Sequence, residues 1–220
     1  MRNLLLAVVV GLSAASASMG ADANQIKQWQ AAADKGDAAA INQLGRAYFF
    51  GDGVEKDLAR AYQLLRQAAD KGVAEAQNAM GFFHYSGLGG AAKDFAESAK
   101  WYRKASEQGL AKSQFNLAMM NLKGEGVAMN AAEAAKWLRA AAEQGFANAQ
   151  YHLGLVCWSG SGVEKNPVEA WKWLSLATAQ KFEDAARQLE GLEKTLKPEQ
   201  VAEAKKLLAA FAPKSVPPKP

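Results

Sequence analysis

Pairs of glycines separated by one residue recur at a nearly constant interval along the chain. They are Gly51/Gly53, Gly87/Gly89, Gly124/Gly126 and Gly160/Gly162, and their first members lie 36, 37 and 36 residues apart. A fixed period of this length is typical of solenoids, in which each repeat is one supersecondary unit that stacks on its neighbours. The period therefore predicts a tandem array of helical units rather than one globular core.

Each glycine pair joins two stretches with helical patterning. The first stretch contains a small residue six positions before the pair, which is Gly45, Gly81, Ala118 or Gly154 in successive units. The second stretch follows a residue that suits a helix N-cap, because a short side-chain oxygen can accept a hydrogen bond from the first turn. These expected caps are Asp57, Asp94, Asn130 and Asn166. A glycine should end the second helix in three units, at Gly72, Gly109 and Gly145.

The small residue of each first helix offers a socket for a large residue of a neighbouring helix. Four and seven residues after each cap, the sequence places a small residue and then Leu64, Trp101, Trp137 or Trp173 on one helix face. Neither helix can bury its apolar stripe alone, so the units must stack. Alanine is abundant and β-branched residues are scarce after residue 20, which favours helix over sheet. The chain is therefore expected to be all-α.

The repeated unit resembles the Sel1-like repeats (the SLR family), which are relatives of the tetratricopeptide repeats. The resemblance is carried by Ala-x-x-x-Leu-Gly-x-x-Tyr-x-x-Gly-x-Gly-Val at residues 40–54 and by Trp-Tyr-Arg-Lys-Ala-Ser-Glu-Gln-Gly at residues 101–109. Departures are mild, with His84, Asn121 and Cys157 at the position of Tyr48. The resemblance implies a right-handed α/α solenoid of four helix-turn-helix SLR units in an exported bacterial protein.

The two ends of the repeat region are expected to be capping helices. Residues 24–35 resemble the second helix of a degenerate unit, and residues 183–193 resemble a fifth first helix. A last helix should start at Pro198 and reach about Phe211. The solenoid is thus predicted over residues 24–211, and the proline-rich residues 212–220 are expected to form a disordered tail.

The start of the chain has the pattern of a secretory signal peptide. Arg2 precedes an apolar run from Leu4 to Leu12, and small residues follow. The run is too short to span a bilayer, which takes about 20 residues. We expect a signal peptide over residues 1–21, with cleavage as late as Ala23 as an alternative, and a periplasmic protein without a membrane anchor. The competing interpretation is a buried N-terminal helix.

Few residues could carry chemistry. His84 and His152 lie at unequal positions in different units, and Cys157, the single cysteine, replaces a tyrosine that should be buried. No Ser-x-x-Lys, Gly-x-Ser-x-Gly, His-Glu-x-x-His or phosphate-loop pattern is present. The sequence therefore predicts no enzyme, no cofactor and no metal site. The small, scattered excess of basic residues also argues against a nucleic-acid partner.

A stripe on the first helices is the candidate partner-binding site. Positions three before, one after and four after each small residue share a helix face, which is concave in tetratricopeptide-like solenoids. These residues are Asn42, Arg46, Phe49, Asn78, Phe82, Tyr85, Phe115, Met119, Leu122, Tyr151, Leu155 and Trp158. Aromatic, Met and Arg side chains are enriched in interface cores. The alternative is that the stripe packs against neighbouring units, which full burial of Phe82, Tyr85, Tyr151 and Trp158 would indicate.

The resemblance implies a monomeric protein-binding module. Exported SLR proteins include immunity proteins that neutralise secreted antibacterial effectors such as type VI lipases. The first interpretation of this sequence is therefore an immunity protein of that kind. The alternative is a scaffold of an envelope, secretion or motility complex, and a hydrolase is the remote alternative. The expected partner is accordingly another protein, either a secreted effector or an envelope component.

Overall fold

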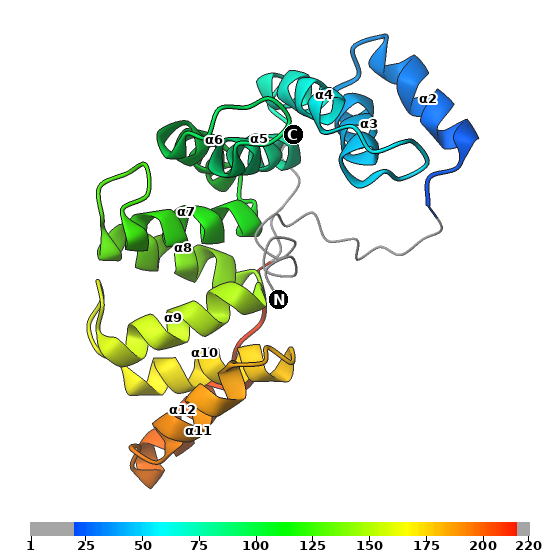
Figure 1. Ribbon diagram of the computed structural model, residues 1–220. Helices are drawn as coiled ribbons and strands as arrows, with labels where there is room; N and C mark the ends of the chain where they lie inside the picture. Colours follow the sequence, from blue (N-terminus) through cyan, green and yellow to red (C-terminus); the bar gives the residue numbers. More distant parts are fainter. Residues whose placement is uncertain (1–19, 215–220) are drawn as a thin grey trace. The chain divides into compact units, whose positions relative to one another are not determined.

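The computed structural model of the chain describes residues 20–214, in which all regular structure is helical (Figure 1). The helices are α2 (Ala23–Ala33), α3 (Ala38–Phe50), α4 (Leu58–Asp70), α5 (Ala74–Ser86), α6 (Phe95–Glu107), α7 (Ala111–Lys123), α8 (Ala131–Glu143), α9 (Ala147–Ser159), α10 (Pro167–Ala179), α11 (Ala185–Glu193) and α12 (Pro198–Ala209). The predicted all-α class is confirmed. The expected signal sequence up to residue 19 and the tail from residue 215 lie outside the described residues.

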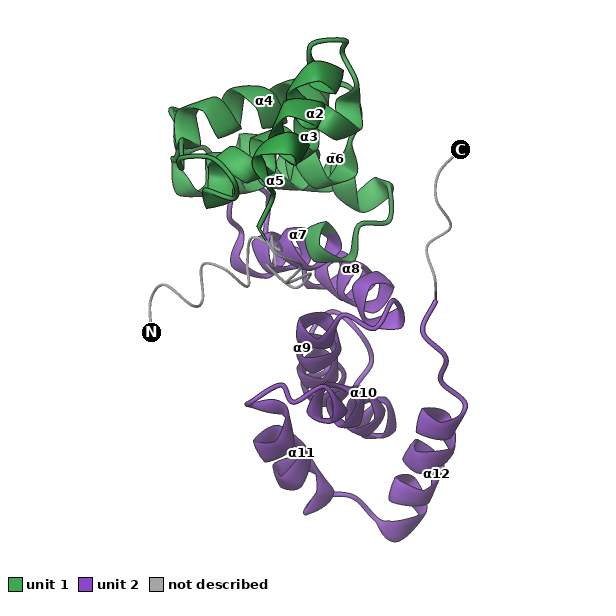
Figure 2. Cartoon of the chain, turned by 90° about the vertical axis from the view of Figure 1, so that its right-hand side faces the viewer, with its two compact units in different colours: residues 1–113 green, residues 114–220 purple. Residues whose placement is uncertain are grey.

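The chain divides into two compact units, residues 1–113 and 114–220 (Figure 2). In the first unit, α2 packs on α3, α3 on α4, α4 on α5 and α5 on α6. In the second unit, α8 packs on α9 and α9 on α10, while α11 and α12 both contact α10. Apart from α12, the helices in these pairs pack on the helix next to them in sequence, as expected for stacked helical repeats.

The second helix of every repeat begins at the residue that the sequence predicts. The side chains of Asp57, Asp94, Asn130 and Asn166 each accept a hydrogen bond from the backbone amide three residues further on, at 2.9 to 3.0 Å. These bonds satisfy amides of the first turn that have no partner inside the helix. Pro167 occupies the first turn of α10, where its missing amide costs nothing.

The glycine pairs are tight turns with backbone constraints at both positions. The first glycine ends helices α3, α5 and α9 in the left-handed conformation, with φ of 76°, 68° and 80° at Gly51, Gly87 and Gly160. The second glycine also has positive φ, and at Gly162 a Cβ would clash with the backbone of Ala131. The pair is therefore required both by chain conformation and by close packing on the preceding helix.

The small residues of the first helices are sockets for side chains from the second helices. A Cβ on Gly81 would lie 2.6 Å from the Tyr102 ring, and one on Gly154 would lie 2.7 Å from Leu174. The residue that fills each socket is the one directly after Trp101 or Trp173, eight positions beyond the cap. The tryptophans are also buried, and lysines cover their rings, with Lys172 Nζ 3.9 Å from the Trp173 centroid.

Paired glutamines connect helices across successive repeats. Gln108 Nε2 donates to Gln77 Oε1 at 2.7 Å and to the carbonyl of Gly72 at 3.0 Å. Gln77 in turn donates to the carbonyl of Ala69. In the second unit Gln180 bonds Gln150 and the Gly145 carbonyl, Gln150 bonds the Ala142 carbonyl, and Gln144 bonds Gln114. These bonds fix the second repeat against the first and the fourth repeat against the third.

Both ends of the repeat region carry extra helices, as the sequence predicts. Asp22 caps α2, and the Ala21 amide donates to Asp52 Oδ1 at 2.8 Å. At the other end, Trp171 Nε1 donates to Glu193 in α11 at 2.8 Å, and α12 packs on α10. Beyond α12, Lys214 Nζ lies 2.7 Å from Glu143 Oε2. The domain boundaries at the outermost residues remain predictions.

Candidate protein-binding surface

A groove of about 530 Å³ opens on the first-helix face of the second unit. It is lined by Leu122, His152, Leu155, Val156, Trp158, Ser159 and Ser161. These residues come from the end of α7, from α9 and from the turn that follows α9. Leu122, Leu155 and Trp158 belong to the predicted stripe, so part of that stripe lies in an open, mainly apolar groove.

His152 gives the groove a neutral polar group instead of a charge. Its ring lies 5.4 Å from the Phe115 ring and 5.1 Å from the Tyr151 ring, between centroids. Burial, and secondarily the positive charge of Lys123, lowers the pKa of His152 to about 4. At neutral pH the imidazole is therefore uncharged, which makes the floor of the groove compatible with an apolar ligand surface.

The other predicted residues of the second unit lie beside the groove and not in its lining. Tyr151 is half-buried and stacks on Phe182, with 4.7 Å between ring centroids. Phe115 is buried, with its ring 5.6 Å from that of Phe146. Met119 is partly exposed on α7. Within the predicted stripe, Phe115 is therefore a buried supporting residue, whereas Tyr151 and Met119 are partly exposed.

The first unit shows the same division. Phe82 is buried at 3% exposure, in contact with Phe49, whereas Phe49 and Tyr85 are partly exposed. The Tyr85 ring lies 5.0 Å from the ring of Phe95, the first residue of α6. Phe50, which the stripe does not include, is the more open aromatic at 42% exposure. Since Tyr85, Tyr151 and Trp158 all keep partial exposure, the stripe is not wholly core.

The polar residues of the stripe are mostly buried. Asn42 and Asn78 are 6% and 3% exposed, and Asn78 Oδ1 accepts a hydrogen bond from Ser113 Oγ at 2.9 Å. Arg46 is partly exposed. Burial removes Asn42, Asn78, Phe82 and Phe115 from direct contact with a large partner, and these four residues support the surface from beneath.

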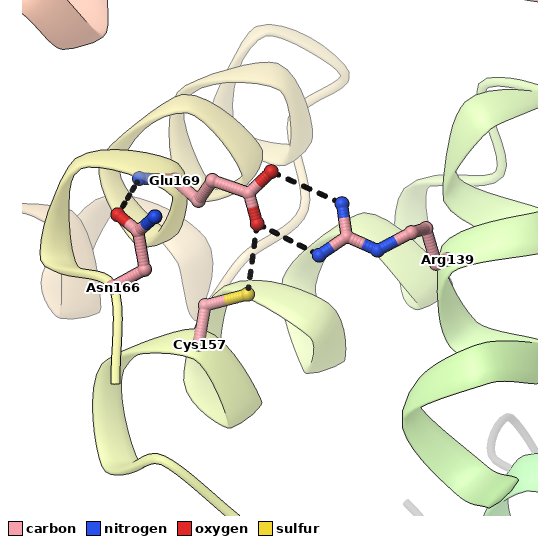
Figure 3. Close-up of polar contacts among 4 residues, drawn as sticks. All are labelled: Arg139, Cys157, Asn166 and Glu169. Carbon is pink, nitrogen blue, oxygen red and sulfur yellow. Dashed lines mark hydrogen bonds and ion pairs between the residues drawn. The ribbon is translucent and has the colours of Figure 1, made fainter. Parts of the chain in front are cut away.

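A polar cluster that sequence reasoning missed joins α8, α9 and α10 (Figure 3). Arg139 donates to both carboxylate oxygens of Glu169, at 3.0 and 2.7 Å, and Cys157 Sγ lies 3.6 Å from Glu169 Oε2. The hydrogen bond from Arg139 holds the pKa of Glu169 below its usual range. The repetition of Arg and Glu in the second helices was a signal for such a pair, but a single sequence does not show which residues meet.

The thiol in this cluster is poorly suited to nucleophilic catalysis. Burial, reinforced by the negative charge of Glu169, raises the pKa of Cys157 to about 11. The thiolate is the reactive form, so at neutral pH Cys157 is almost entirely an unreactive thiol. The cluster is better explained as a structural connection among three helices.

Within residues 20–214, no three His, Cys, Asp or Glu side chains are grouped so that they could hold a metal ion. In the same part of the chain, no helix has the length and apolar character needed to cross a membrane.

The fold and the groove together define an α-helical repeat protein with a candidate binding surface on its first helices. Comparison with known proteins agrees with this class. The Sel1 repeat matches residues 38–73, 74–110, 111–146 and 147–182. This chain belongs to the Sel1 repeat family.

Solved structures show the same relationship, while no curated protein matches the chain. A Sel1 repeat protein from Oxalobacter formigenes is 32% identical with a TM-score of 0.68, and the alignment covers 77% of this chain and 73% of that one. A protective antigen present in uropathogenic Escherichia coli strains, which displays an SLR fold, is 24% identical with a TM-score of 0.53. That alignment covers 90% of this chain and 58% of the antigen, and it shows likeness of fold alone. Sel1 repeat proteins generally mediate protein–protein interaction and are generally non-enzymatic.

Proposed function

We propose that this protein is an exported, periplasmic protein-binding module whose groove takes up an apolar side chain of a partner protein. The observation that carries the proposal is the open groove in which Leu122, Leu155 and Trp158 come together. A partly exposed Trp beside aliphatic side chains can contribute much of the binding energy once a partner excludes water from it.

The rest of the groove suits the same kind of ligand. His152 is neutral at neutral pH, so an apolar group can cover it without burying a charge. Ser159 and Ser161 supply hydroxyl groups next to the apolar residues. An apolar centre with a polar edge is the usual composition of a protein interface.

The binding proposal is tested with two tryptophan variants of the same unit. Trp158→Ala should weaken partner binding about 30-fold or more, because it removes the largest side chain of the groove. Trp137→Ala is the control, since this half-buried residue of α8 is bonded to Glu133 and does not line the groove. Each variant is used as bait in envelope extract, and bound proteins are quantified by mass spectrometry. Equal capture by both variants, or capture of nothing by the unmodified protein, would contradict the proposal.

The captured protein also decides between the two biological roles. We propose that it is a secreted antibacterial effector, which would make this chain an immunity protein. The sequence features behind this choice are the signal-like start and the repeat region without a catalytic motif. A toxic enzyme whose activity falls upon binding would support immunity. A component of a secretion or motility complex would instead support the scaffold role.

Export is proposed from the first residues of the chain, and we place the cleavage after Ala21. Either cut removes Ala21 and its bond to Asp52. A cut after Ala21 retains Asp22, the N-cap of α2, whereas a cut after Ala23 also removes Asp22 and loses about 1 kcal/mol of helix stabilisation. When the full chain is expressed in a bacterium, the periplasmic fraction should contain a protein that begins at Asp22. Intact-mass measurement checks the result, and an unprocessed chain in the cytoplasm would contradict export.

A further inference from the structure

The groove has an equivalent place earlier in the chain, because the four repeats form two successive pairs. Three groove residues align with phenylalanines of the first two repeats. The aligned residues, each separated by the length of two repeats, are Leu122 with Phe49, Leu155 with Phe82, and Val156 with Phe83. The two places can therefore be compared position by position.

In the first two repeats this place is filled by aromatic rings of the protein itself. The Phe49 ring lies 6.0 Å from the Phe82 ring and 5.7 Å from the Phe83 ring, between centroids, and both pairs are edge-to-face. Phe82 is buried, with Phe49 and Leu88 packed against it. Edge-to-face pairs are favourable beyond the area that they bury, so these rings stabilise the contact between α3 and α5.

The groove lies where the last two repeats carry smaller side chains. Leu122, Leu155 and Val156 have no rings, and a space of about 530 Å³ remains open beside them. Leu122 and Leu155 are partly exposed, so a ligand can reach them. The space that aromatic rings fill in the first two repeats is therefore left free in the last two. An aromatic side chain is the apolar group whose shape suits it best.

An indole ring forms one side of the groove. Trp158 aligns with Tyr85 and is partly exposed. Gly191 of α11 lies against the end of this indole, since a Cβ on Gly191 would be 3.6 Å from Trp158 Cη2. The indole is therefore backed by a helix on one side and open to the groove on another. An incoming aromatic ring gains from contact with such an indole beyond the area that it buries.

A lysine lies next to the groove at the position of the exposed Phe50. Lys123 is the last residue of α7 and directly follows Leu122. It is exposed, and within residues 20–214 no ion pair engages it. Its charge is the second cause, after burial, of the lowered pKa of His152, so the ammonium group lies near the groove. Since the lining itself is uncharged at neutral pH, Lys123 favours a carboxylate at the edge of the groove.

We propose that the groove binds an aromatic side chain from a short segment of the partner protein, and that an acidic residue beside it pairs with Lys123. The proposal rests on the proposed protein-binding function and names the chemistry of the segment that enters the groove. The partner's ring would pack on Leu122, Leu155 and Trp158. It would supply the ring contacts that Phe49 and Phe82 make within the first two repeats.

A double variant that copies the first two repeats should fill the groove. It combines Leu122→Phe with Leu155→Phe. Both positions are partly exposed, so the added rings can extend into open space without compressing the core. We expect the thermal unfolding midpoint to stay the same or to rise, because apolar space is filled. Leu122→Phe alone, which adds one ring, serves in its place if the double variant does not fold.

The binding test is selection of a phage-displayed random heptapeptide library against the purified protein, after removal of peptides that bind the double variant. Enriched sequences should share a Phe, Tyr or Trp with Asp or Glu beside it. Synthetic copies should bind the unmodified protein about 10-fold or more tightly than they bind the double variant. Changing the aromatic residue of a peptide to Leu should weaken its binding by a similar factor.

The role of Lys123 is measured with the same synthetic peptides. Lys123→Glu should weaken their binding about 5-fold, and Lys123→Gln should weaken it less. Lys136→Glu is the matched control, because it makes the same charge change at an exposed residue of α8 that does not line the groove. The peptides should bind this control with unchanged affinity. Their binding to the unmodified protein should weaken as sodium chloride is raised.

The outcomes distinguish this proposal from the protein-binding function on which it rests. Enriched peptides with only aliphatic residues, or aromatic peptides that bind the double variant equally well, would overturn the aromatic proposal. Equal effects of Lys123→Glu and Lys136→Glu would overturn the acidic part. Failure to enrich any sequence would overturn the whole proposal. Protein binding through the groove is measured separately, by partner capture with Trp158→Ala, and would stand in each of these cases if that variant loses the partner.

Discussion

Replacing Gly81 with leucine is expected to lower the free energy of unfolding by about 3 kcal/mol, the largest effect among the single changes considered for this chain. Even a methyl group at this position would lie 2.6 Å from the ring of Tyr102, which is 1% exposed. Because the ring is buried, making room for leucine requires the α5–α6 pair to separate. The thermal midpoint, followed by circular dichroism, should fall by roughly 10 °C.

A double variant tests whether the socket causes this loss. The third repeat has Ala118 and Leu138 at the positions of Gly81 and Tyr102, and both are fully buried. Gly81→Ala and Tyr102→Leu should each destabilise the protein by about 2 kcal/mol, but the double variant should be less destabilised than the sum of the two. If the two losses simply add, the contact between Gly81 and Tyr102 is not the cause.

Acidification from pH 7 to pH 5 is expected to cost about 2 kcal/mol of folding free energy through His152 alone. Burial lowers the folded-state pKa of His152 from 6.5 to about 4. Between these values the unfolded chain binds a proton that the folded chain does not bind. The stability that depends on neutral His152 is therefore fully present above pH 6.5 and is lost as the pH falls toward 4.

The control for this prediction is the difference between variants. His152→Gln cannot titrate, so its stability should change about 2 kcal/mol less than that of the unmodified protein between pH 7 and pH 5. His84→Gln keeps His152 and should retain the part of the pH dependence that His152 contributes. Urea unfolding at the two pH values gives both quantities. Parallel losses in the unmodified protein and His152→Gln would show that other groups carry the acid sensitivity.

Much of the fold could be predicted because its determinants are local in sequence. The cap residues Asp57 and Asn166 act within one turn of their own helices, and Gly51 sets the backbone of its own turn. Such positions can be recognised by their residue type, and they recur with the period of the repeat. The helix boundaries and the extra helices at each end followed from them.

The candidate site was less predictable because exposure depends on residues distant in sequence. Phe82 and Tyr85 both belong to the predicted stripe on α5, yet Phe82 is buried and Tyr85 is partly exposed. Helical periodicity gives the direction of a side chain but not what lies above it. The bidentate pair of Arg139 and Glu169 was missed for a similar reason, since the two residues are 30 positions apart.

The glutamine pairs have a consequence for how such a chain can change its length. Gln108 and Gln77 lie in one repeat, and the carbonyls of Gly72 and Ala69 that they reach lie in the repeat before it. A tandem gene duplication of one complete repeat would copy both the donors and the acceptors, so every junction would be satisfied again. The first repeat has Ile41 and Lys71 at the two glutamine positions, which makes it unsuitable as an internal copy. Duplication of a later repeat can therefore lengthen the array. The first repeat lacks the glutamines that bond to a preceding repeat, so a copy of it would not form this junction inside the array.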